Sequence, residues 1–115
     1  MRDQKEHLRD ILDAIESIQR YSTRGREAFE HDELIQVWMV HHLQIIGEAA
    51  AQLGRDFHAM HSEAPWPQIV AMRNILVHEY FGVDLDEVWQ VIVGDLPAFK
   101  KQVERLLMML EETDG

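Results

Sequence analysis

The stretch "ELIQVWMVHHLQIIGEAAAQLG", residues 33 to 54, decides the fold of this chain. Its apolar residues cover most of the circumference of a helix, as expected for a helix that is packed on several sides. Gly54 follows the last apolar residue and is placed to end the helix. The exception is a polar stripe at helical spacing, which consists of Glu33, Gln36, His41, Gln44, Glu48 and Gln52. We therefore predict a central helix over residues 32 to 53 with one wet or functional side.

The segments before and after this helix also show helical spacing of apolar residues. The first covers roughly residues 3 to 21 and is followed by a loop at "STRGRE", where Gly25 and short polar residues cluster. After the central helix, the two prolines of "HSEAPWP" interrupt the pattern. Pro67 can then serve as the first residue of a new helix that runs to about Phe81 and stops at Gly82.

The C-terminal third predicts two more helices. Asp84 and Glu87 have the spacing of a capping box for the first of them. Pro97 either starts or kinks the last helix, in which apolar residues again recur at helical spacing. No segment reads as a strand, and there are no repeats or linkers. We predict an all-α fold, an antiparallel bundle of four or five helices, with residues 1–115 forming one domain.

The charge balance limits the possible partners. The chain has 11 Lys and Arg against 21 Asp and Glu, a net charge of -10, which argues against broad electrostatic capture of nucleic acid or of an anionic membrane. Any contact with RNA must therefore be local. The charged N-terminus "MRDQKEHLRD" has no apolar run after it, and no segment is apolar enough to span a membrane, so we expect a cytoplasmic protein.

Metal and cofactor sites are not expected. The absence of cysteine rules out a disulfide scaffold and a thiolate metal site. His58 and His61 have a spacing that metal ligands can use, but no third ligand is evident, and ordinary surface histidines are the simpler interpretation.

A second stretch, "MRNILVHEYFG" at residues 72 to 82, combines Arg73, Asn74, His78 and Tyr80 with apolar residues. On a helix these four polar residues share about half of the surface. A strip facing the core would not take an arginine, because an unpaired buried charge costs several kcal/mol. A strip facing only solvent would not need the apolar residues between them. The mixture indicates a groove or an interface that meets an anion or another subunit.

Arginine and histidine together fit metal-independent cleavage of RNA. An imidazole can take the proton from a ribose 2′-hydroxyl, while a guanidinium stabilises the charge that develops on the phosphate. The leaving 5′-oxygen also needs an acid, and this helix supplies one histidine per chain, so a two-fold dimer would supply both groups. The alternative is structural: Arg73 pairs with a carboxylate and His78 caps a helix end.

The sequence around this stretch resembles the HepT-like HEPN ribonuclease toxins. Arg73, His78 and Tyr80 match the arginine-x4-histidine-x-tyrosine signature of that family. Four flanking blocks match in the same order, and they are "IIGEAA", "PWPQIVAMRN", "YFGVDLDEVW" and "DLP". The resemblance spans nearly the whole chain.

This resemblance implies a helical HEPN fold that forms a homodimer, with Arg73 and His78 of both subunits lining one RNA-cleaving cleft. Asn74 occupies the polar position that often follows the arginine. The resemblance also implies a type VII-like toxin–antitoxin pair, in which a minimal nucleotidyltransferase of the MNT type transfers AMP to Tyr80. AMP at Tyr80 would place a bulky anion on the same helical strip as Arg73.

Two further interpretations stay open at the level of sequence. Glu48 lies on the polar stripe and either orients Arg73 or His78 or is a solvated glutamate. Trp38, Trp66 and Trp89 are expected to be core or interface anchors before they are base-stacking platforms.

A second class of function also stays open. In it, the chain is a non-catalytic helical partner that presents substrate to the nucleotidyltransferase.

Overall fold

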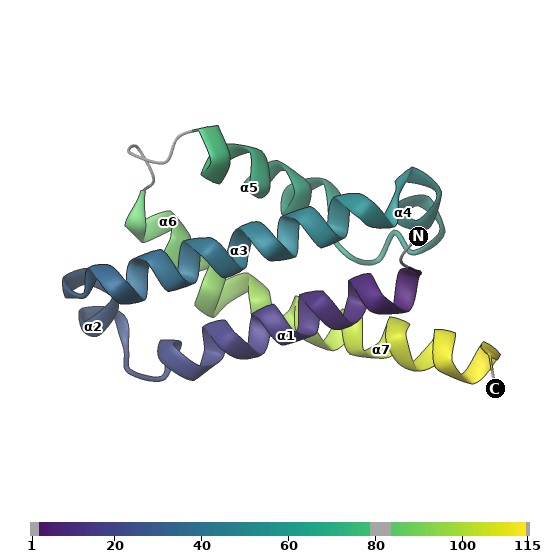
Figure 1. Ribbon diagram of the computed structural model, residues 1–115, viewed down its shortest axis with the longest axis horizontal. Helices are drawn as coiled ribbons and strands as arrows, with labels where there is room; N and C mark the ends of the chain where they lie inside the picture. Colours follow the sequence, from purple (N-terminus) through teal and green to yellow (C-terminus); the bar gives the residue numbers. More distant parts are fainter. Residues whose placement is uncertain (1–2, 79–83, 115) are drawn as a thin grey trace.

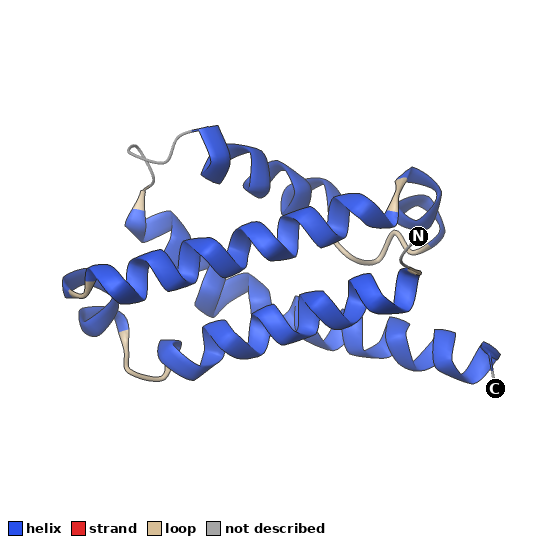
Figure 2. Ribbon diagram, viewed as in Figure 1, coloured by secondary structure: helices blue, strands red, loops and turns tan. Residues whose placement is uncertain are grey.

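The computed structural model describes residues 3–78 and 84–114 (Figure 1). All regular elements in these two ranges are helical, and Figure 2 shows no strand among them. The elements are α1 (Gln4–Ser22), α2 (Arg26–His31), α3 (Glu33–Leu53), α4 (Arg55–Met60), α5 (Trp66–His78), α6 (Leu85–Gln90), the π-helical η2 (Val91–Asp95) and α7 (Leu96–Asp114). The predicted all-α bundle is therefore confirmed.

Helix α3 is the centre of the bundle. It packs on α1 along one side and on α5 along another, and α1 packs in turn on α7 (Figure 1). The core between these helices is apolar, and its largest fully buried side chains are Trp66, Phe29, Phe99, Leu8, Ile11, Ile15, Ile18, Met39, Leu43, Ile46, Leu96 and Leu106. Trp66 and Trp89 are both buried, as expected for core anchors, whereas Trp38 is only partly buried.

Local capping explains where several helices begin and end. Asp32 accepts a hydrogen bond from the Leu34 amide and so caps the start of α3. Gly54 ends α3 with a φ of 90°, a left-handed conformation that glycine adopts without a Cβ clash. Asp84 accepts from the amides of Asp86 and Glu87, which confirms it as the cap of α6.

Two short helices were not predicted. Residues 26–31 form α2 directly after the loop around Gly25, and residues 55–60 form α4 after Gly54. Arg26 joins α2 to α6, because it forms ion pairs with Glu30 at 2.7 Å and with Asp86 of α6. The hydrogen bond to Glu30, aided by the charge of Asp86, raises the pKa of Arg26.

The junction before Pro97 contains a feature that was not predicted. Helix α6 continues through the π-helical η2 into α7, and the Leu96 amide donates to the Val91 carbonyl. Proline has no N–H, and its ring crowds the carbonyl four residues earlier, so the wider π turn lies where Pro97 needs room. Pro97 is the second residue of α7, which agrees with the prediction that it starts the last helix.

Helix α5 begins at Trp66, one residue before Pro67. Its predicted end near Phe81 and stop at Gly82 lie outside the described residues. No helix in the described ranges combines the length and the apolar character that a membrane span requires.

Candidate functional site

Arg73 of α5 and Glu48 of α3 face each other across the contact between these helices. The Arg73 Nη1 donates to the Glu48 Oε2 at 3.0 Å, and the side chains are 28% and 55% exposed. An ion pair this exposed contributes about 1 kcal/mol or less to stability. Its main effect is therefore on where the guanidinium points. Glu48 thus contacts Arg73, one of the two partners considered for it, while the side chain of His78 lies outside the described residues.

Gly47 allows the two helices to come close at this point. It is buried in α3, and a Cβ added to it would lie 2.4 Å from the Cβ of Arg73 and 3.2 Å from its Cα. These atoms belong to the backbone and to the stem of the side chain, so they could not simply swing away. Gly47 and Glu48 thus act together: the glycine lets α5 approach and the glutamate binds the arginine that α5 carries.

Glu48 is itself held in place by its own helix. The Gln52 amide nitrogen donates to the Glu48 Oε1 at 3.2 Å, while the other carboxylate oxygen accepts from Arg73. Both oxygens therefore have a donor. This arrangement holds the carboxylate, and through it the guanidinium, in a defined position on the surface.

The pair opens into a shallow depression of about 400 Å³ between α1, α3 and α5. Its lining consists of Asp10, His41, Gln44, Ile45, Glu48, Ala49, Gln52 and Arg73. Most of the α3 residues in this lining belong to the predicted polar stripe. His41 was not among the predicted site residues, although its position seven residues before Glu48 places it on the same face of the helix.

The other residues of the signature are only partly covered by the structure. Residues 66–78 are helical, so Arg73, Asn74 and His78 belong to one helix, and Arg73 and His78 are about 7.5 Å apart along its axis. The side chains of Asn74 and His78, and all of Tyr80, lie outside the described part.

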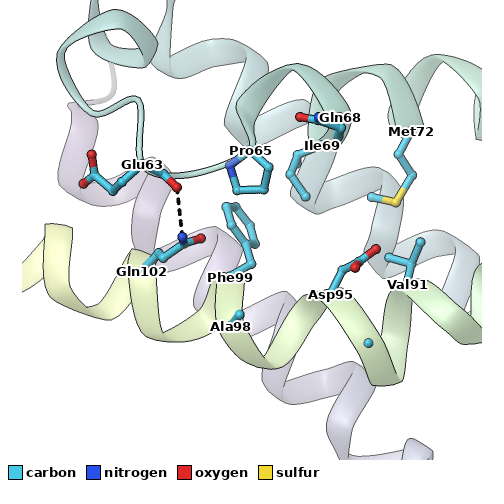
Figure 3. Close-up of a pocket in the computed structure, with 11 residues that line it drawn as sticks. Glu63, Pro65, Gln68, Ile69, Met72, Val91, Asp95, Ala98, Phe99 and Gln102 are labelled. Carbon is cyan, nitrogen blue, oxygen red and sulfur yellow. Dashed lines mark hydrogen bonds between the residues drawn. The ribbon is translucent and has the colours of Figure 1, made fainter.

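A second depression, of about 520 Å³, lies between α5, η2 and α7 (Figure 3). Figure 3 shows Ile69, Met72 and Phe99 lining it, with Gln102 donating to the Glu63 carbonyl at 3.0 Å. Its described lining contains carboxylates but neither histidine nor arginine. Because Met72 is the residue before Arg73, this depression is on a different side of α5 from the Glu48–Arg73 pair.

Comparison with known proteins assigns the chain to a family. The model of the family "Ribonuclease HepT-like" matches residues 11–106, which include Glu48, Arg73, His78 and Tyr80. The chain belongs to this HepT-like ribonuclease family, a family of RNA-cleaving enzymes, and the predicted resemblance is confirmed.

Individual relatives agree with this assignment. A protein of Thermococcus cleftensis named probable ribonuclease HepT is 38% identical over 91% of this chain and 96% of its own length. A protein of Caldanaerobacter subterraneus, provisionally named an RNase, is 37% identical over 93% of this chain and 96% of its own length. Another provisionally named RNase, from Methanocaldococcus jannaschii, is 35% identical over 90% of this chain and 95% of its own length. No solved structure matches the chain significantly.

Proposed function

We propose that this protein is a metal-independent endoribonuclease that acts as the toxin of a HEPN/MNT toxin–antitoxin pair. The observation that carries the proposal is the position of Arg73. In a member of a ribonuclease family, this arginine is partly exposed, held by Glu48 and seated on a close contact between α3 and α5. A guanidinium fixed in this way is suited to bind a phosphate through its fork of N–H groups.

The proposed reaction is an attack within the RNA chain. His78 of one subunit takes the proton of a ribose 2′-hydroxyl, and the 2′-oxygen forms a bond to the adjacent phosphorus. The bond from phosphorus to the 5′-oxygen breaks, and an acid returns a proton to that oxygen, so that a 2′,3′-cyclic phosphate and a 5′-hydroxyl result. Arg73 stabilises the negative charge on the non-bridging oxygens.

Two subunits are needed for this scheme. Each α5 offers one histidine in the signature, whereas the reaction uses a base and an acid. In the proposed homodimer, Arg73 and His78 of both chains line one cleft. Glu48 is a positioning residue that acts through Arg73, and Asn74 supports the polar character of the cleft.

The experiment that tests this function uses the purified wild-type protein and single-stranded RNA, with and without EDTA. We expect cleavage to continue at an unchanged rate in the chelator, with products that end in a cyclic phosphate, because the nucleophile is the 2′-hydroxyl of the substrate. Cleavage that stops in EDTA and returns with a divalent ion would contradict the mechanism. A protein that binds the nucleotidyltransferase but leaves RNA intact would instead be the non-catalytic partner.

The proposed regulation is AMP transfer to Tyr80 by a nucleotidyltransferase antitoxin. Tyr80 follows His78 by two residues, so an attached AMP would bring a bulky anion close to the site where the phosphate of RNA binds. The charge of the modification would compete for Arg73, and its bulk would exclude the substrate.

Tyr80→Phe is expected to keep most of the nuclease activity and to escape inactivation by the antitoxin. A phenol with a pKa near 10 is a poor base at neutral pH, so the chemistry does not require it. Mass spectrometry of wild-type protein from cells that contain the nucleotidyltransferase should show one or more AMP groups on the peptide with Tyr80. An inactive Tyr80→Phe protein would place the hydroxyl in the reaction, and an unmodified Tyr80 in rescued cells would point to inhibition by binding alone.

A further inference from the structure

A third depression lies at the opposite end of the seam between α1 and α3. It has a volume of about 270 Å³ and is lined by Tyr21, Arg24, Asp32, Leu34, Ile35 and Trp38. Leu34 is 80% exposed at its edge, which is unusual for a leucine in a helix whose other apolar residues are mostly buried. This lining combines two aromatic rings, a cation and a carboxylate. We call it the α1–α3 end pocket.

The aromatic rings of this pocket are held rigidly. The Trp38 Nε1 donates to the Ser17 carbonyl at 2.8 Å, which fixes the indole against α1. The Tyr21 ring meets the indole edge to face, with 5.2 Å between centroids. The Arg24 guanidinium lies over the Tyr21 ring, 4.9 Å from its centroid. The pocket therefore presents a preformed set of flat groups, at little further cost in side-chain entropy.

A row of rings joins this pocket to the depression that contains Arg73. The His42 ring packs on Trp38 with 4.3 Å between centroids, and its Nδ1 lies 2.8 Å from the Trp38 carbonyl oxygen. The His41 ring follows, 5.1 Å from that of His42 and edge-on to it. His41 in turn lines the depression beside Glu48 and Arg73. Trp38 and Glu48 are about 15 Å apart along the axis of α3.

We propose that the α1–α3 end pocket binds a base of single-stranded RNA, a few nucleotides away from the phosphate that is cleaved. This inference rests on the proposed ribonuclease function and adds a substrate subsite to it. Bases that are not paired stack on tyrosine, tryptophan and histidine rings and on arginine planes. The Asp32 carboxylate accepts from the Leu34 amide through Oδ1, so its other oxygen is the one proposed to accept a hydrogen bond from the amino group of a base. The Arg24 guanidinium over the Tyr21 ring adds a positive charge that favours the RNA backbone.

The charge of the protein makes such a subsite useful. With a net charge of -10, the chain cannot collect RNA through a broad basic surface. Stacking on aromatic rings does not depend on net charge, and every base offers a flat face for it. A stacking pocket on the α1–α3 seam, which leads to the depression that contains Arg73, would thus supply affinity that the electrostatics of this protein do not.

Binding of an uncleavable RNA tests the subsite. The probe is a fluorescent single strand of ten 2′-O-methyl nucleotides, which lacks the attacking hydroxyl, and its dissociation constant is measured by anisotropy. Tyr21→Leu removes one ring of the pocket. Leu34→Glu adds a negative charge at its edge, and this variant should fold because Leu34 is 80% exposed and an acidic residue is favourable in the first turn of a helix. The matched control is Met60→Glu, which makes the same charge change at a 77% exposed residue of α4.

We expect Tyr21→Leu to weaken binding about fivefold to a hundredfold, the range that the loss of a base–aromatic stack commonly produces. Leu34→Glu should also weaken binding at least about fivefold, because its carboxylate repels the phosphates of an RNA held in the pocket. Met60→Glu should bind like the wild type. The proposal is overturned if the wild type does not bind the probe, or if Leu34→Glu and Met60→Glu bind it equally well. Cleavage of ordinary RNA by the wild type is scored separately. Binding that depends on the pocket without any cleavage would keep the subsite and reject the proposed nuclease.

Discussion

Arg73→Ala is expected to lower the rate of RNA cleavage by about 100-fold or more at saturating RNA. The guanidinium is proposed to stabilise charge that appears on the phosphate only in the transition state, and the loss of one such donor commonly costs that much in kcat. The measurement is the initial rate of cleavage by purified wild-type and variant protein. An Arg73→Ala protein with wild-type kcat would remove this residue from the chemistry.

Three further variants separate the charge of Arg73 from its position. Arg73→Lys keeps the positive charge but loses the planar fork, so its kcat should fall between those of the wild type and Arg73→Ala. Glu48→Ala keeps the guanidinium in the chain but removes the carboxylate that orients it. We expect a lower kcat with little change in melting temperature, since the ion pair is partly exposed. Glu48→Gln retains an oxygen acceptor and should recover part of the rate. If both Glu48 variants have the melting temperature and the kcat of the wild type, the ion pair does not position Arg73.

A dimer with one His78→Ala subunit is expected to be nearly inactive. If one subunit supplies the base and the other the acid, the loss of either histidine removes half of the proton transfers that one cleavage event needs. Removal of a positioned acid or base commonly costs about 100-fold or more. Subunits with two different affinity tags allow such mixed dimers to be purified and their cleavage rate to be compared with that of the doubly tagged wild type.

A doubly tagged dimer with one Met60→Glu subunit is the appropriate control, because Met60 is exposed on α4 and has no proposed role. It should cleave at the wild-type rate. A His78→Ala mixed dimer that keeps about half of the wild-type rate would show that each subunit works alone. The requirement for a shared cleft would then be wrong, even if each chain proved to be a ribonuclease.

Much of this fold was accessible from the sequence because its signals are local. The central helix, its end at Gly54 and the cap at Asp84 follow from residue spacing and capping chemistry. Helices α2 and α4 were missed because six residues are too few to show a periodic pattern. The π-helical η2 was missed because a change of hydrogen-bond register over five residues does not alter which residue types are used.

The site was less accessible because its decisive features are tertiary. Glu48 could be selected from its place on a polar stripe, but its contact with Arg73 could not, since that contact depends on how α3 packs against α5. The sequence also gave no reason to separate Trp38 from the other two tryptophans. Only the packing shows that Trp38 remains partly exposed in a pocket while the others are buried.

The close contact between α3 and Arg73 requires that residue 47 has only a hydrogen atom as its side chain. Most neighbouring helices are kept apart by side chains, but α3 presents bare backbone to the stem of Arg73 at this point. We expect a methyl group in place of that hydrogen to push α3 and α5 apart at this contact and to weaken the Glu48–Arg73 ion pair. A substitution at residue 47 would therefore change the spacing of the two helices, whereas a substitution at Glu48 would change only the side-chain contacts to Arg73 and Gln52.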